Sequence, residues 1–306
     1  MGQHLLLNDN TLWVFVTCSQ EARHLDDVVF GIHVLRGRGV SDDRILVFSD
    51  HSKVGPHLDP YAIGSFPLSS LAAKLVAVPP HRYAVVVVGG HGHVAGLGPT
   101  PSPPSQPILP AHQLFSAIRA IPELVLGIVV LSQCFGGVFN YADALAHPQL
   151  VVIGATNLNP SLSMTISIRE PIRQVDGSEG LRSWLANIFT AALFSWLRSP
   201  TDIDGDGQHT LMDAYKHAGA TSNEMLRNAK SGLFVQARTF EKALAETEEE
   251  LANVTPASDP TGLTGQLLTL RLGAQKQQLA EVLQNLYLHQ EPWVLHANLA
   301  REACFA

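Results

Sequence analysis

The sequence is poor in cysteine and has no long apolar run. Its 306 residues include three cysteines, which are too few and too scattered for a disulfide framework. No apolar stretch reaches the roughly 20 residues that cross a bilayer, and no basic segment leads into an apolar one near the N-terminus. We therefore expect a cytoplasmic protein with reduced thiols and no membrane partner.

Positive charge is also scarce. Lys and Arg total 20 against 27 Asp and Glu, which gives a formal net charge of −7. A protein that binds nucleic acid carries a basic face, and one that binds a membrane surface carries a cluster of Lys and Arg. The sequence has neither feature, so we expect no nucleic acid and no membrane among its partners.

Short apolar runs alternate with helical patterns over the first 155 residues. Runs of β-branched and aromatic residues predict strands at 11–17, 44–48, 83–88, 127–132 and 151–154. Apolar residues at helical spacing predict helices at 20–36, 69–78, 111–120 and 138–146. Because the strands alternate with helices and several are wholly apolar, we expect an α/β fold whose mostly parallel sheet is covered on both faces.

The later part of the chain is largely helical. The pattern predicts helices at 181–197, 210–251 and 265–288. Residues 253–264 contain two prolines and a glycine and are typical of a linker. We therefore expect one domain over residues 1–252, the linker 253–264, and a C-terminal helical extension over 265–306 that is a candidate regulatory cap.

Two reactive side chains follow two of the predicted strands. His91 follows strand 83–88, and Cys134 follows strand 127–132. Ligands of open parallel sheets bind at the carboxyl ends of the strands, so both side chains open onto one cleft if these strands are neighbours. A thiolate could then attack a carbonyl while the imidazole manages the proton of the leaving amine. The backbone N–H groups of Gly92 and Cys134 would hold the oxyanion. The alternative is that Cys134 is a buried structural thiol.

The order of these motifs resembles the caspase, legumain, gingipain and metacaspase group of cysteine peptidases. Residues 85–92 (VVVVGGHG) and 128–137 (IVVLSQCFGG) match its histidine and cysteine segments. Residues 23–28 (RHLDDV) and 39–45 (GVSDDRI) are similar to two legumain signatures, and 155–163 (ATNLNPSLS) looks like a diverged segment after the last core strand. The resemblance implies a caspase-like three-layer sandwich with a mostly parallel central sheet, followed by C-terminal helices.

The resemblance also implies roles for individual residues. His91 and Cys134 would be the catalytic dyad. Arg23 would line the primary specificity pocket, where its guanidinium suits an Asn carbonyl or an Asp carboxylate. The candidate substrate-binding residues are Arg23, His24, Ser132, Ser161 and Ser163. Ser132 stands where legumains carry Glu, caspases Gln and metacaspases Asp, so this chain departs from the family pattern there.

By the same resemblance, the chemistry needs no cofactor and the substrate is a protein in a signalling or defence cascade. Members of the group often begin as zymogens, so an activating protease or regulatory protein is an expected partner. The proline-rich residues 99–110 and the linker 253–264 are the expected sites of activating cuts. Hydrolysis and peptide-bond transfer share one acyl-enzyme, so the sequence leaves the hydrolase and ligase outcomes open.

An aspartate-rich loop precedes the helix predicted at 210–251. Asp202, Asp204 and Asp206 stand at the first, third and fifth positions of a calcium-loop frame, and Asp213 stands at the twelfth. Asp213 replaces the usual bidentate Glu. This spacing predicts a Ca²⁺ site, and the alternative is an acidic helix N-terminus that interacts with the helix dipole.

Two other classes of function stay open. His91 and His93 have the His-x-His spacing of metal-dependent hydrolases, which would require further ligands after other strands. A non-catalytic caspase-like adaptor would use the same fold only to bind partners. Retention of both dyad residues favours the peptidase over the adaptor.

Overall fold

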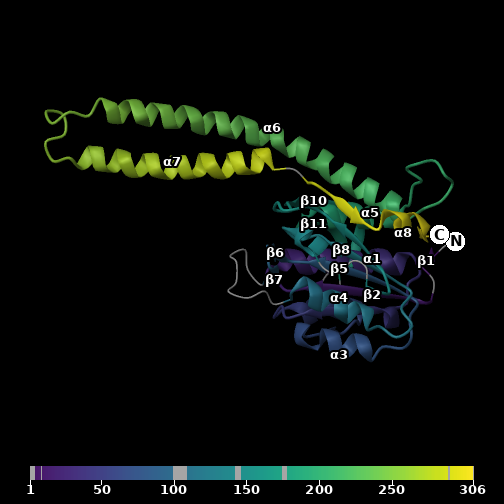
Figure 1. Ribbon diagram of the computed structural model, residues 1–306. Coiled ribbons are helices and arrows are strands. Elements are labelled where there is room, and N and C mark those ends of the chain that lie inside the picture. The colour runs from purple at the N-terminus through teal and green to yellow at the C-terminus, as the bar shows by residue number, and fades with distance from the viewer. Residues whose placement is uncertain are drawn as a thin grey trace. The chain divides into compact units, whose positions relative to one another are not determined.

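The main β-sheet is mostly parallel and has helices on both faces (Figure 1). This computed structural model describes residues 4–7, 9–98, 109–141, 146–173, 178–288 and 290–305. Within these ranges, the main sheet has the order β12 (Trp293–Leu295), β9 (Leu150–Gly154), β8 (Leu126–Leu131), β5 (Tyr83–Gly89), β2 (Thr11–Thr17), β3 (Ile45–Ser49) and β4 (Ser65–Phe66). All its pairings are parallel except that of β12 with β9.

Alternate residues of the central strands pack against opposite helical layers. One face is covered by α1 (Ala22–Gly37) and α5 (Ile188–Arg198), and the other by α3 (Leu71–Val76) and α4 (Ala111–Arg119). In β2, Trp13 and Phe15 join the first core, whereas Leu12, Val14 and Val16 join the second. Strands that are apolar on both faces need this double cover. The predicted α/β sandwich with a mostly parallel sheet is therefore confirmed.

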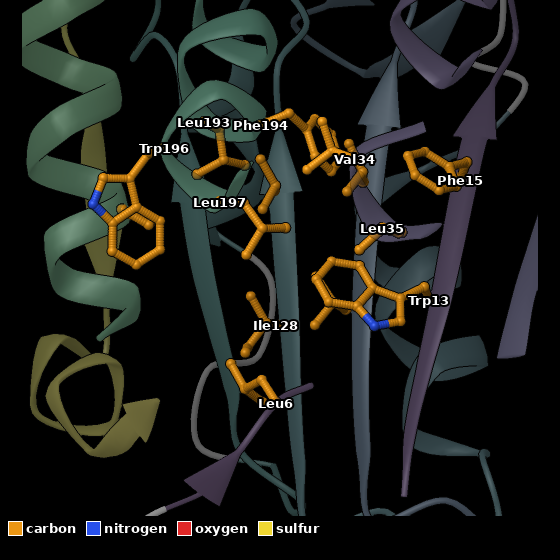
Figure 2. Packing of buried hydrophobic residues seen from close by; sticks show 14 of the residues in the cluster. Leu6, Trp13, Phe15, Val34, Leu35, Ile128, Leu193, Phe194, Trp196 and Leu197 are labelled. Carbon is orange, nitrogen blue, oxygen red and sulfur yellow. The ribbon is translucent and has the colours of Figure 1, made fainter. Parts of the chain in front are cut away.

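Large aromatic side chains fill the core beneath α5 and α1 (Figure 2). Phe194 of α5 stacks on Phe15 of β2 with ring centroids 5.9 Å apart. Trp196 meets Phe305, near the C-terminus, edge-to-face at 5.7 Å. Because burial of each such side chain stabilises the fold by about 1.5–3 kcal/mol, these rings hold α5 and the C-terminal residues to the sheet.

Further elements lie outside the main sheet. They are β1 (His4–Leu5) paired with β13 (Ala303–Cys304), β6 (His91–His93) paired with β7 (Gly96–Gly98), β10 (Ser163–Arg173) paired with β11 (Glu179–Asn187), and the helices α2 (Val54–Leu58), α6 (Leu211–Ala252), α7 (Leu263–Tyr287) and α8 (Ala297–Glu302). Among the described helices, none combines the length and apolar character that a membrane span needs.

The five strands predicted for the sheet are all present, but two predicted helices differ. The helix expected at 181–197 begins only at Ile188, because residues up to Asn187 pair with β10 and the Asn187 side chain accepts hydrogen bonds from the N–H groups of Phe189 and Thr190. A 3₁₀ turn at residues 136–141 takes the place of the start of the helix expected at 138–146, and residues 142–145 lie outside the described ranges. Most of the predicted cut site at 99–110 also lies outside them.

The chain divides into two compact units. Unit 1 contains residues 1–222 and 290–306, and unit 2 contains residues 223–289. Within unit 2, α7 packs on the second half of α6 through ion pairs that join Arg271 to Glu250 and Lys276 to Glu248. The chain then returns to unit 1, where β12 extends the main sheet. The division thus differs from the predicted boundaries at 252 and 265, because residues 290–306 contribute a strand to the first domain instead of prolonging a helical extension.

Candidate active site

His91 and Cys134 follow adjacent strands of the sheet. β5 and β8 pair in parallel with Val88 opposite Leu131, so both chains leave the sheet at the same edge. Between β5 and His91 the backbone turns at Gly90, whose φ of +120° strongly favours glycine. Cys134 comes three residues after the end of β8. The neighbouring strands on which the sequence prediction depended are thus present.

The backbone of Gly92 lies directly against the Cys134 segment. A Cβ atom at Gly92 would come within 1.8 Å of the Cys134 carbonyl oxygen and 2.6 Å of Gln133 Cγ. The Ser161 N–H donates to the Cys134 sulfur at 3.3 Å, and the backbone N–H groups of Cys134 and Gly92 also act to lower the pKa of this thiol. Donors around a reactive sulfur are also near the position where an attacked carbonyl would develop negative charge.

Cys134 is the only partly exposed thiol of the three in the sequence, because Cys18 and Cys304 are buried. Burial raises the pKa of the Cys134 thiol, although the hydrogen bond from Ser161 and the charge of Arg23 oppose this rise. Burial likewise lowers the pKa of His91 below its usual value, against the effect of Glu21. At neutral pH the free protein therefore holds an uncharged thiol and an uncharged imidazole.

Glu21 joins the candidate base to the candidate specificity residue. Its Oε1 lies 2.7 Å from His91 Nε2, and its Oε2 lies 2.6 Å from Arg23 Nε. Arg23 also donates from Nη1 to Ser163 Oγ. No hydrogen bond joins the His91 and Cys134 side chains in the described part of the chain, and catalytic hydrogen bonds are often long without substrate. Sequence reasoning missed Glu21, and its place just before Arg23 was the available signal.

Three of the five predicted substrate-binding residues lie together near Cys134. Arg23 contacts Ser163, and the backbone of Ser161 contacts the Cys134 sulfur. The other two stay predictions. Ser132 is 3% exposed and its hydroxyl donates to the Val88 carbonyl. His24 is 4% exposed and packs edge-on against His91 with ring centroids 5.2 Å apart.

Asn187 is a second residue that sequence reasoning missed. Its Nδ2 donates to the Ser132 carbonyl at 2.7 Å and to Ser161 Oγ at 2.9 Å, while its Oδ1 caps α5. Its backbone N–H donates to the buried carboxyl of Asp27 at 3.2 Å. The signal was an asparagine just before an apolar helical run, which is a common N-cap. Asn187 therefore ties the start of α5 to the segments on both sides of Cys134.

The aspartate loop gathers three of the four predicted metal ligands. Carboxylate oxygens of Asp202, Asp204 and Asp206 lie within 4.8 Å of one another, and Lys216 Nζ lies 2.7 Å from Asp204. Asp213 is corrected, because its two oxygens accept hydrogen bonds from Ile203 N–H and from the N–H and hydroxyl of Thr210. Calcium binding by the other three aspartates stays a prediction.

No comparable group forms around the histidines. Within the described ranges, the aspartate trio is the only cluster of three or more His, Cys, Asp or Glu side chains close enough to share a metal ion. His91 Nε2 is already bonded to Glu21. The arrangement thus gives no support to a metal-dependent hydrolase that uses His91 and His93.

Replacement of Asp213 by Asn should destabilise the fold by about 2 kcal/mol, since hydrogen bonds to a buried charged group contribute roughly 1.5–3 kcal/mol. Burial raises the Asp213 pKa, but hydrogen bonds from Thr210 and Ile203 outweigh this effect and leave it below its usual value. The stabilisation should therefore be complete at neutral pH and disappear as pH falls below the ordinary Asp pKa of roughly 3.9. Urea unfolding at several pH values measures this loss.

Asp206→Asn is the matched control, because the Asp206 side chain is exposed. Its effect should stay within about 0.5 kcal/mol. Equal losses in the two variants would contradict the structural role of Asp213.

Comparisons with known proteins do not assign this chain to a family. No family model matches the chain, and no curated protein matches it. Among solved structures, it is similar to the crystal structure of drICE, a caspase, with 11% sequence identity and a TM-score of 0.36 over 70% of this chain and 82% of that one. A likeness of this size assigns no activity, so the functional argument depends on the geometry of the site.

Proposed function

We propose that this protein is a cysteine endopeptidase in which Cys134 is the nucleophile and His91 the general base. One observation carries the proposal. His91 and Cys134 follow adjacent parallel strands, and the Gly92 backbone lies directly against the Cys134 segment, where the N–H groups of Gly92 and Cys134 act to lower the pKa of the thiol. Nucleophile, base and oxyanion donors are the three components of acyl transfer. The order of sequence motifs, which resembles the caspase–legumain group, supports the same reaction.

The reaction would proceed through an acyl-enzyme. His91 takes the thiol proton of Cys134, and the sulfur forms a bond to the carbonyl carbon of the substrate. The N–H groups of Gly92 and Cys134 stabilise the resulting oxyanion. The C–N bond then breaks as His91 returns the proton to the leaving amine. Attack by water, with His91 again as base, releases the acid and regenerates the thiol.

The Arg23 guanidinium favours a substrate with Asn or Asp before the cleaved bond. Arg23 is 21% exposed, and a guanidinium binds a planar carbonyl or carboxylate through paired N–H groups. Ser163 adds a hydroxyl bonded to Arg23, and the Ser161 N–H donates to the Cys134 sulfur. By analogy with the group, the substrate is a protein of a signalling or defence cascade, and an activating protease or regulatory protein controls the enzyme.

Cleavage of a mixed peptide library by wild type and by Cys134→Ala tests the proposal, with calcium present and absent. All cuts should disappear in the variant, whereas Cys304→Ala should cleave normally because that thiol is buried. A peptide aldehyde with Asn or Asp at its end should label Cys134 selectively. Cuts that persist in Cys134→Ala would reject the peptidase proposal. No cleavage and no labelling by wild type would favour the adaptor.

Arg23→Ala should lower kcat/KM for peptides with Asn or Asp at the cleaved bond by about 10- to 100-fold, since a charge-assisted hydrogen bond contributes roughly 1.5–3 kcal/mol. Peptides with an apolar residue there should be much less affected. Arg227→Ala is the control, because the Arg227 side chain is 76% exposed in unit 2. A uniform loss on all peptides would instead indicate that Arg23 acts through Glu21 and His91 or through the fold, and not through contact with the substrate.

A further inference from the structure

We propose that Glu21 is a positioning residue for His91. The Glu21 carboxylate accepts the hydrogen bond from Nε2–H of the imidazole, which leaves Nδ1 as the nitrogen that accepts the Cys134 proton. This inference rests on the proposed peptidase function and adds a third member to its dyad. It starts from the shortest contact of His91, the 2.7 Å separation between its Nε2 and Glu21 Oε1.

The Glu21 carboxylate fixes which nitrogen carries the proton. Burial raises the Glu21 pKa, but hydrogen bonds from Arg23 and His91 outweigh this effect and keep the carboxyl ionised at neutral pH. An ionised carboxylate only accepts hydrogen bonds, so the facing Nε2 must be the donor. The neutral imidazole then has its lone pair on Nδ1, which is the state a general base requires.

The backbone around Glu21 is held in place from both sides. Glu21 is the residue before α1, with extended φ and ψ of −88° and 128°. Its N–H donates to Ser19 Oγ at 3.0 Å, and its carbonyl accepts from the His24 N–H at 3.1 Å. Arg23 then holds the second carboxylate oxygen at 2.6 Å. A support fixed at both ends orients a functional side chain more accurately than a mobile loop does.

The charge of Glu21 also matters for the reaction. When His91 takes the thiol proton it becomes an imidazolium, and Glu21 supplies the negative charge that stabilises it. The other groups that act on His91 are Arg23 and His24 on α1 and His93 on β6. Burial lowers the pKa of His24 to about 3, so His24 stays neutral, and Arg23 opposes the imidazolium. Glu21 is thus the acidic group that compensates for Arg23.

Glu21→Gln tests the proposal, because it removes the charge and keeps an oxygen that can accept from Nε2–H. Two readouts need no peptidase activity. In a Cys134→Ala background, the His91 pKa followed by NMR should fall. In the otherwise wild-type chain, iodoacetamide should alkylate Cys134 at least about tenfold more slowly at neutral pH, since the thiolate is the reactive form. The value of kcat should fall at least about tenfold, with KM little changed.

Glu241→Gln is the matched control. Glu241 is 41% exposed and forms a 2.7 Å ion pair with Arg238, much as Glu21 is 43% exposed and pairs with Arg23 at 2.6 Å. This control should leave both readouts at their wild-type values. Glu21→Asp, which shortens the reach and keeps the charge, should recover part of the His91 pKa.

The outcomes separate this inference from the proposed function. An unchanged His91 pKa and alkylation rate in Glu21→Gln would overturn the role of Glu21, even if wild type cleaves peptides. An effect on KM alone would also overturn the positioning role and would assign Glu21 to substrate binding. If wild type cleaves nothing but both readouts change as expected, the peptidase proposal fails and the Glu21–His91–Cys134 arrangement stands.

Discussion

Gly92→Ala should reduce kcat/KM by about 100- to 1,000-fold, which is the typical effect of losing one oxyanion donor. The added Cβ would lie 1.8 Å from the Cys134 carbonyl oxygen, a separation that no non-bonded atoms maintain. The clashing atom belongs to the backbone, which cannot rotate away from the new Cβ as the end of a flexible side chain could. The histidine segment and the cysteine segment must therefore move apart, and the Gly92 N–H moves away from the sulfur.

Gly89→Ala is the control for that prediction. It lies three residues earlier in the same glycine-rich segment, and its added Cβ would meet only Ser132 Oγ at 3.7 Å, an ordinary contact. Steady-state kinetics should therefore differ sharply between the two variants, while circular dichroism shows both folded. Equal and small effects would mean that Gly92 is not held against Cys134 in the active protein.

The strand pattern of the sheet could be predicted because its signal is local. The apolar runs at 11–17, 83–88 and 127–132 contain the residues that fill both faces, and each became a strand within one residue of the expected bounds. The helix expected at 181–197 failed for a non-local reason. The apolar periodicity of α5 continues backward into residues that pair with β10, and only the Asn187 cap separates the two.

The candidate site was predictable only in part. His91, Cys134 and Gly92 follow strands, so their positions could be derived from the sheet. Glu21 and Asn187 come from segments that lie 70 residues before His91 and 53 residues after Cys134, and their partners are set by the packing of α1 and α5 on the sheet. Ser132 and His24 were assigned from the family resemblance alone. Both are buried, which could not be predicted because a residue's neighbours in the chain do not determine which way its side chain faces.

Asn187→Ala should lower the free energy of unfolding by about 4 kcal/mol, as expected when a helix cap and buried hydrogen-bond partners are lost together. The Oδ1 of Asn187 accepts from Phe189 and Thr190 at the start of α5. Its Nδ2 is bonded to the carbonyl of Ser132, a residue that is itself buried. Truncation to alanine removes all of these bonds at once, and urea denaturation measures the total.

Asn187→Ser separates the two contributions. Serine can still cap α5 through its hydroxyl, and the cap alone contributes about 1 kcal/mol, but serine has no amide to reach Ser132 and Ser161. Ser161 donates its N–H to the Cys134 sulfur and its hydroxyl accepts from Asn187 Nδ2, so Asn187→Ala should also lose peptidase activity. We expect Asn187→Ser to recover about 1 kcal/mol of stability relative to alanine and none of this activity. If serine restored activity along with stability, the Asn187 amide would have no part in arranging the active site, and Asn187 would act only as the N-cap of α5.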